Sequence, residues 1–124
     1  MSRQNIYIAM GSLAYAITKA DGQIQEQEKS TIKQLAQKEF ELNDQDNEWI
    51  EHMFSKLEKD KISLDDAYNY ALDVLEANRY EFDFDQEMKQ KCVKFMEKIA
   101  ESVDGVSVNE QLIIKKFKKD ITRF

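Results

Sequence analysis

Two short segments of this chain place carboxylates around a glycine turn. Each has an aspartate directly before a glycine and a glutamate several residues later: Asp21, Gly22 and Glu28 in the first segment, and Asp104, Gly105 and Glu110 in the second. Carboxylate oxygens are the ligands that hard cations such as Ca²⁺ and Mg²⁺ prefer. If the fold brings the two turns together, the four carboxylates can share one divalent cation. We therefore predict a weak calcium or magnesium site with these metal ligands: Asp21, Glu28, Asp104 and Glu110.

The two glutamates also have a purely structural interpretation, which the sequence leaves open. Glu28 and Glu110 both stand in the first turn of an expected helix, where a glutamate can accept a hydrogen bond from a free backbone N–H. Ser107 and Glu110 have the spacing of a complete capping box. The aspartate and the glutamate are seven residues apart in the first turn and six in the second. Any site built from both turns is therefore asymmetric.

A conventional EF-hand loop is excluded. The first segment matches the second half of such a loop, but the two preceding ligand positions hold Ile17 and Lys19. The corresponding positions of the second segment hold Ala100 and Ser102. Most side-chain oxygen ligands of that loop are therefore missing.

Each turn joins two stretches whose apolar residues recur every three or four positions, as in amphipathic helices. The chain has no proline and only three glycines, which favours helix throughout. Two further helices are expected after the N-cap residues Asn43 and Ser63. We predict an all-α fold, with residues 1–124 as a single compact domain of about six helices. Segments 4–20 and 26–39 form one helical hairpin, 85–103 and 107–121 form a pseudo-symmetric second hairpin, and a two-helix insert lies between them.

The apolar stripes of the four hairpin helices predict one shared core, made of these residues: Leu13, Ile17, Ile32, Leu35, Met96, Ile99, Ile113 and Phe117. Trp49 and Ile50 are expected on the apolar face of the third helix. Gly11 lies inside the first helix, where glycine costs about 1 kcal/mol relative to alanine, so a close helix crossing is expected there. Cys92 is the only cysteine and stands among apolar residues, so we expect a core residue rather than a reactive thiol.

Charge is distributed unevenly along the chain, whose net charge is −6. Residues 43–87 carry fourteen acidic and four basic side chains, and this acidic middle argues against nucleic-acid binding. No apolar run is long enough to cross a membrane, and the chain does not start with an apolar signal sequence. We therefore expect a cytoplasmic protein that binds no nucleic acid and does not insert into a membrane.

The sequence carries no catalytic signature. The only histidine, His52, falls on the polar side of its expected helix, and no nucleophile, phosphate-loop or zinc spacing occurs. The many carboxylates stand at helix starts, where they complement the helix dipole. We predict that the protein is not an enzyme.

The segment from Tyr80 to Asp85 alternates aromatic and acidic residues. This period of two does not fit a helix. Two interpretations remain open: an extended segment that packs its aromatic rings into the domain, or an exposed docking surface for a protein partner.

At the repeated turns the sequence resembles the TerB-like family, which includes tellurite-resistance protein TerB and the N-terminal domain of DjlA-type co-chaperones. The family is marked by two hairpins with an Ala-Asp-Gly-x-Ile-x-x-x-Glu motif, which the segment from Ala20 to Glu28 matches throughout. The second copy departs from the motif, because Val103 replaces the alanine and the interval from Gly105 to Glu110 is one residue shorter. The resemblance spans nearly the whole chain.

This resemblance implies an all-helical protein with a non-catalytic, stress-associated role in tellurite resistance. It also implies divalent cation binding by an acidic surface, with these residues at the matching positions: Asp21, Glu28, Asp104 and Glu110. Three functions remain for comparison: a cation-responsive module that docks an unidentified protein partner, a structural or adaptor domain without metal, and a hydrolase with paired carboxylates. The hydrolase is the least favoured of the three.

Overall fold

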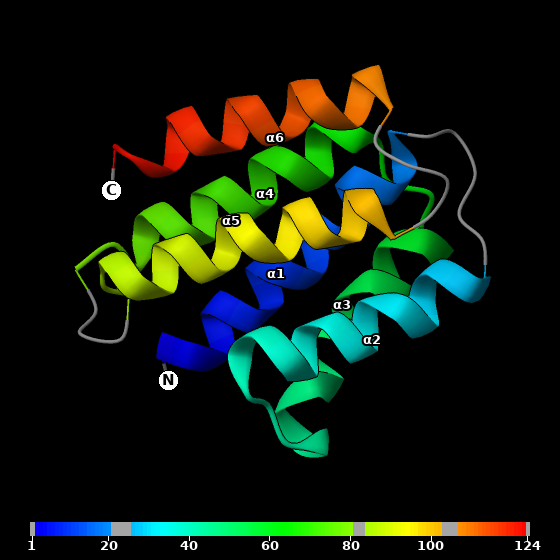
Figure 1. The fold of residues 1–124 in the computed structure, drawn as a ribbon, viewed down its shortest axis with the longest axis horizontal. Helices are drawn as coiled ribbons and strands as arrows, with labels where there is room; N and C mark the ends of the chain where they lie inside the picture. Colours follow the sequence, from blue (N-terminus) through cyan, green and yellow to red (C-terminus); the bar gives the residue numbers. More distant parts are fainter. Residues whose placement is uncertain (1, 21–25, 81–83, 103–106, 124) are drawn as a thin grey trace.

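The computed structural model describes residues 2–20, 26–80, 84–102 and 107–123. Over these ranges the chain forms α-helices and contains no strand, so the all-α prediction is confirmed (Figure 1). The helices are α1 (Ser2–Lys19), α2 (Glu26–Phe40), α3 (Asp44–Lys59), α4 (Leu64–Ala77), α5 (Gln86–Glu101) and α6 (Val108–Ile121).

Polar side chains fix the starts of four helices. The Asn43 side chain accepts a hydrogen bond from the Asp46 N–H at 2.7 Å, and the Ser63 hydroxyl accepts one from the Asp66 N–H at 3.1 Å. At the start of α5 the capping residue is Asp85. Each cap satisfies a backbone donor that has no partner inside its own helix, which is why these short polar sites set the helix boundaries.

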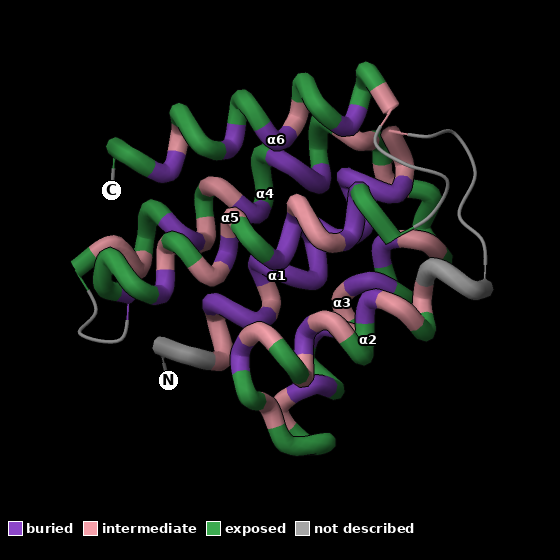
Figure 2. Tube along the Cα trace, viewed as in Figure 1, coloured by how far each residue is buried: buried purple, intermediate pink, exposed green. Residues whose placement is uncertain are grey.

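Helix α1 lies at the centre of the fold. Every residue from Ala9 to Thr18 is buried, and Figure 2 shows α1 as the most continuously buried helix. Helices α3 and α4 pack closely along α1, and α5 and α6 contact it as well. The expected two-helix insert is therefore not a peripheral addition, because α3 and α4 supply most of the surface that covers α1.

The glycine of α1 marks its crossing with α3. A β-carbon at Gly11 would lie 2.6 Å from the Ile50 carbonyl oxygen and 2.9 Å from the Met53 β-carbon. Both distances are shorter than van der Waals contact, so the helices come this close only because residue 11 has no side chain. The predicted close crossing is confirmed.

Helices α1 and α2 run antiparallel but do not form the tightly packed hairpin that the sequence suggested. Helix α2 packs mainly on α5 and α3. Its contact with α1 includes the Tyr7 and Phe40 rings, whose centroids are 6.1 Å apart. Helices α5 and α6 do pack on each other, so the two expected hairpins differ in spacing. The reason is that α3 and α4 occupy the flanks of α1.

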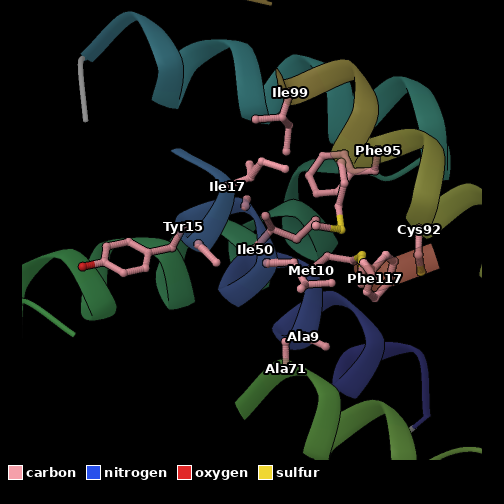
Figure 3. Packing of buried hydrophobic residues seen from close by; sticks show 14 of the residues in the cluster. Ala9, Met10, Tyr15, Ile17, Ile50, Ala71, Cys92, Phe95, Ile99 and Phe117 are labelled. Carbon is pink, nitrogen blue, oxygen red and sulfur yellow. The ribbon is translucent and has the colours of Figure 1, made fainter. Parts of the chain in front are cut away.

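One hydrophobic cluster joins all six described helices. Figure 3 shows part of it, with labelled residues from α1, α3, α4, α5 and α6. Six of the eight predicted core residues are buried in it: Leu13, Ile17, Ile32, Met96, Ile99 and Phe117. Leu35 and Ile113 are only partly buried at its edge. In α6 Ile114 is buried instead of Ile113, because the buried stripe of this helix runs through Glu110, Ile114, Phe117 and Ile121.

Cys92 is fully buried within this cluster, as expected for a core thiol. Burial raises the pKa of the Cys92 thiol well above its ordinary value of 9.0. Tyr68 is also buried. Burial, followed by the hydrogen bond to Asp120, raises the pKa of the Tyr68 hydroxyl above its ordinary value of 10.0.

These two groups predict a loss of stability in alkaline solution. Above pH 9.0 the unfolded chain loses the Cys92 proton that the folded protein keeps, and above pH 10.0 the same holds for Tyr68. Unfolding then releases protons, so the free energy of unfolding falls as pH rises, by up to about 1.4 kcal/mol per pH unit for each group. Urea unfolding of wild type and Cys92→Ala at several alkaline pH values measures this slope. The slope should be shallower in the variant; equal slopes would contradict the role of the thiol.

Candidate functional site at the paired turns

The flanks of the two Asp-Gly turns meet at one end of the molecule. The Asn109 side-chain amide, at the start of α6, donates a hydrogen bond to the Ala20 carbonyl oxygen at 3.4 Å. Ala20 directly follows α1, where helix carbonyls lack partners within the helix. Figure 1 shows the end of α1 beneath the start of α6. Residues 89 positions apart in the chain are therefore neighbours, as the repeat suggested.

Glu110 forms the capping box that the sequence predicted. The Ser107 hydroxyl accepts a hydrogen bond from the Glu110 N–H at 3.1 Å. In return, the Glu110 Oε1 atom accepts one from the Ser107 N–H at 3.0 Å. The Glu110 side chain is only 4% exposed. The capping role is confirmed for this residue, and its role as a metal ligand stays a prediction.

The other three predicted ligands cannot be placed in the same way. Asp21 and Asp104 lie outside the described residues, and Glu28 is described only as part of the α2 backbone. Within the described part of the chain, no group of three or more His, Cys, Asp or Glu side chains is arranged to hold a metal ion. The cation site therefore stays a prediction.

The described frame around the turns is held by contacts between different elements. The Tyr15 hydroxyl, in the second half of α1, donates to the Ile62 carbonyl oxygen at 2.6 Å. The Lys29 ammonium, in the first turns of α2, lies 2.6 Å from the Glu58 carboxylate of α3. These contacts fix α1 and α2, the two helices that flank the first turn, against the end of α3 and the α3–α4 connection.

Two residues of types often used in catalysis lie in unrelated surroundings within the described part of the chain. His52 is exposed on the outer side of α3, and the Cys92 thiol is buried with a raised pKa. Trp49, predicted on the apolar face of α3, is 37% exposed. The prediction is therefore wrong for Trp49 and confirmed for Ile50, which is buried together with Asn47. Trp49 lies at the edge of the buried face.

The aromatic segment after α4 fits neither of its two interpretations, packed segment or docking surface, along its whole described length. Tyr80 is 88% exposed, whereas Phe84 is buried in the core. Phe82 lies outside the described residues. The Arg79 guanidinium lies 4.6 Å from the centroid of the Tyr80 ring, which covers one face of that ring with a cation. The described part of this segment is therefore neither an extended segment with all its aromatic rings packed into the domain nor a continuous apolar surface.

A second polar site joins α4 and α6 and was not predicted. The Tyr68 hydroxyl donates to the Asp120 Oδ2 atom at 2.7 Å. In the sequence, Tyr68 is one of two neighbouring tyrosines within an expected helix, and Asp120 is one acid within a basic helix end. No motif links two residues that are 52 positions apart, so only the fold reveals the pair.

None of the described helices is both long and apolar enough to span a membrane. No curated protein and no solved structure gives a significant match to the chain. A protein-family model described as tellurite resistance protein TerB matches residues 7–121. This match begins within α1 and continues to the end of α6, so it includes the meeting point of α1 and α6. The chain therefore belongs to the TerB family.

Proposed function

We propose that this protein is a non-catalytic binding module of tellurite resistance and stress response that binds one divalent cation weakly at its paired turns. The observation that carries the proposal is the hydrogen bond between Asn109 and Ala20. It brings together the flanks of the two turns that contain the predicted aspartates. Calcium and magnesium are the cations that suit carboxylate and carbonyl oxygens.

The expected affinity is low. Glu110 already uses one carboxylate oxygen in its capping box, so a cation must rely on the remaining oxygens, chiefly those of Asp21 and Asp104, together with backbone carbonyls and water. Open calcium sites with few protein ligands have dissociation constants of about 10⁻⁴ to 10⁻³ M. We expect binding in this range.

The test is a titration of the labelled protein with CaCl₂ or MgCl₂, followed by amide NMR at constant ionic strength. In the wild type, the amides of Ala20, Ser107 and Asn109 should shift with a saturating curve. The double variant Asp21→Asn/Asp104→Asn should lose these shifts. The matched control, Asp65→Asn/Asp66→Asn, removes the same charge from the exposed first turn of α4 and should bind as the wild type does.

Two outcomes would overturn the cation site. One is the absence of saturable shifts in the wild type at millimolar calcium and magnesium. The other is equal loss of binding in both double variants, because this would show a general effect of negative charge rather than a site at the turns.

The capping box supports a second candidate, a structural or adaptor domain without metal. Ser107 and Glu110 form a complete capping box, so the start of α6 needs no cation for its stability. In either case we propose that the protein acts by docking a protein partner, whose contacts would include exposed aromatic side chains such as Trp49 and Tyr80. The single, buried, free cysteine suits a reducing compartment, so we place the protein in the cytoplasm.

A further inference from the structure

A cavity of about 410 Å³ lies between α4 and α6. These helices run side by side in Figure 1. Three basic side chains line the cavity, namely Arg79, Lys116 and Arg123. Its acidic lining residues are Glu76 and Asp120. We call this cavity the α4–α6 groove. Its lining carries a net positive charge in a protein whose net charge is −6.

The Asp120 carboxylate is already bound on both oxygens. The buried Tyr68 hydroxyl donates to Oδ2 at 2.7 Å, and the Arg123 Nη2 atom lies 3.3 Å from Oδ1. Because burial and this hydrogen bond raise the Tyr68 pKa, the hydroxyl keeps its proton and stays a donor. The negative charge of Asp120 is thus largely compensated by its own neighbours, which lowers its repulsion of an anion in the groove.

The other two cations of the groove have no carboxylate partner among the described residues. The Lys116 ammonium lies over the Tyr68 ring, 4.7 Å from its centroid. The Arg79 guanidinium donates through Nη1 to the Glu76 carbonyl oxygen at 2.7 Å and lies over the Tyr80 ring. A guanidinium has five N–H donors and an ammonium has three. Both groups therefore keep donors for a ligand while aromatic rings hold them in place.

We propose that the α4–α6 groove binds a compact oxyanion, such as phosphate or the phosphate group of a small organic molecule. Lys116 and Arg79 bind its oxygens, while Arg123 stays paired with Asp120 and offsets the negative charge of that carboxylate. The groove is larger than a phosphate ion, and Leu72 gives it an apolar wall, so an organic part can be accommodated. This site is separate from the paired turns, because Asp120 and Asn109 lie at opposite ends of α6.

The test uses two probes, inorganic phosphate and adenosine monophosphate, each titrated into the full-length protein at constant ionic strength set with chloride. Amide NMR should show saturable shifts at Tyr68, Asn69, Lys116 and Asp120. In Lys116→Gln the affinity should fall by about tenfold, because one charge-assisted hydrogen bond is lost. The matched control is Lys115→Gln, whose exposed side chain lines the other flank of α6, between α5 and α6, and whose affinity should stay within about twofold of the wild type.

The outcomes distinguish a free oxyanion from an organic phosphate, and they also show whether the groove binds an anion at all. Equal affinity for both probes supports a site for the free oxyanion, and tighter binding of adenosine monophosphate supports an organic phosphate. Both lysine variants are exposed, and circular dichroism checks that each is folded. The proposal is overturned if neither probe gives saturable shifts, or if Lys115→Gln weakens binding as much as Lys116→Gln does. Neither result would bear on the cation site at the turns.

Discussion

The Phe95→Ala variant is expected to lose about 3–5 kcal/mol of unfolding free energy. The Phe95 ring is fully buried, and its centroid lies 5.4 Å from that of Phe40 in an edge-to-face arrangement. Phe40 in turn contacts Tyr7 of α1. The ring therefore links α5 through α2 to the central helix, and its removal leaves a cavity that none of these anchored helices can close.

Urea unfolding followed by circular dichroism measures this loss. The matched control is Leu35→Ala in α2, since Leu35 is only partly buried at the edge of the same hydrophobic core. The loss of unfolding free energy in Leu35→Ala should be clearly smaller, because folding buries less apolar surface at that position. A typical domain is stable by about 5–15 kcal/mol, so the Phe95 variant should be folded only marginally. A loss below about 1 kcal/mol at Phe95 would contradict a single core shared by these helices.

The second large effect is expected at the crossing of α1 and α3. In the Gly11→Ala variant, the new β-carbon meets the Ile50 carbonyl oxygen and the Met53 β-carbon. Neither atom is the end of a flexible side chain, so the helices must separate. Overpacking of this kind costs about 1–3 kcal/mol, and sometimes more. In an open helix the same change would stabilise the protein by about 1 kcal/mol, so the sign of the effect is diagnostic.

Thermal and urea unfolding of Gly11→Ala give this sign directly. A Ser55→Ala variant on the exposed side of α3 controls for the effect of alanine on helix propensity and should change stability by less than about 0.5 kcal/mol. A stabilised Gly11→Ala variant would show that α1 and α3 do not approach as closely as described.

Local features of the fold could be predicted from the sequence because their causes are local. The caps at Asn43 and Ser63 each bond to a backbone N–H three residues away, so a short polar motif in the sequence is enough to predict them. The packing of the helices was harder to predict from the sequence. Ile113 and Ile114 are adjacent and chemically identical, so the helical period alone does not decide which of them faces the core. The neighbours of α6 decide it, and they are remote in the sequence.

Of the two candidate sites, one could be predicted from the sequence and the other could not. The turns could be found because their motif occurs twice, and the repeat also suggested that their flanks meet, as Asn109 and Ala20 do. The α4–α6 groove could not be found, because its residues come from two unrelated helices. In the sequence Tyr68 is one of two neighbouring tyrosines in an expected helix, and only the approach of Asp120 makes it part of a polar site.

The central position of α1 has a consequence for how the protein is made. Its main covering helices, α3 and α4, start at Asp44 and Leu64, and α5 starts only at Gln86. At about 5–20 residues per second, the ribosome takes seconds to deliver these partners after α1 has emerged. During that time α1 keeps its apolar surface in water. The domain therefore completes its fold only after α6 has been synthesised, rather than helix by helix.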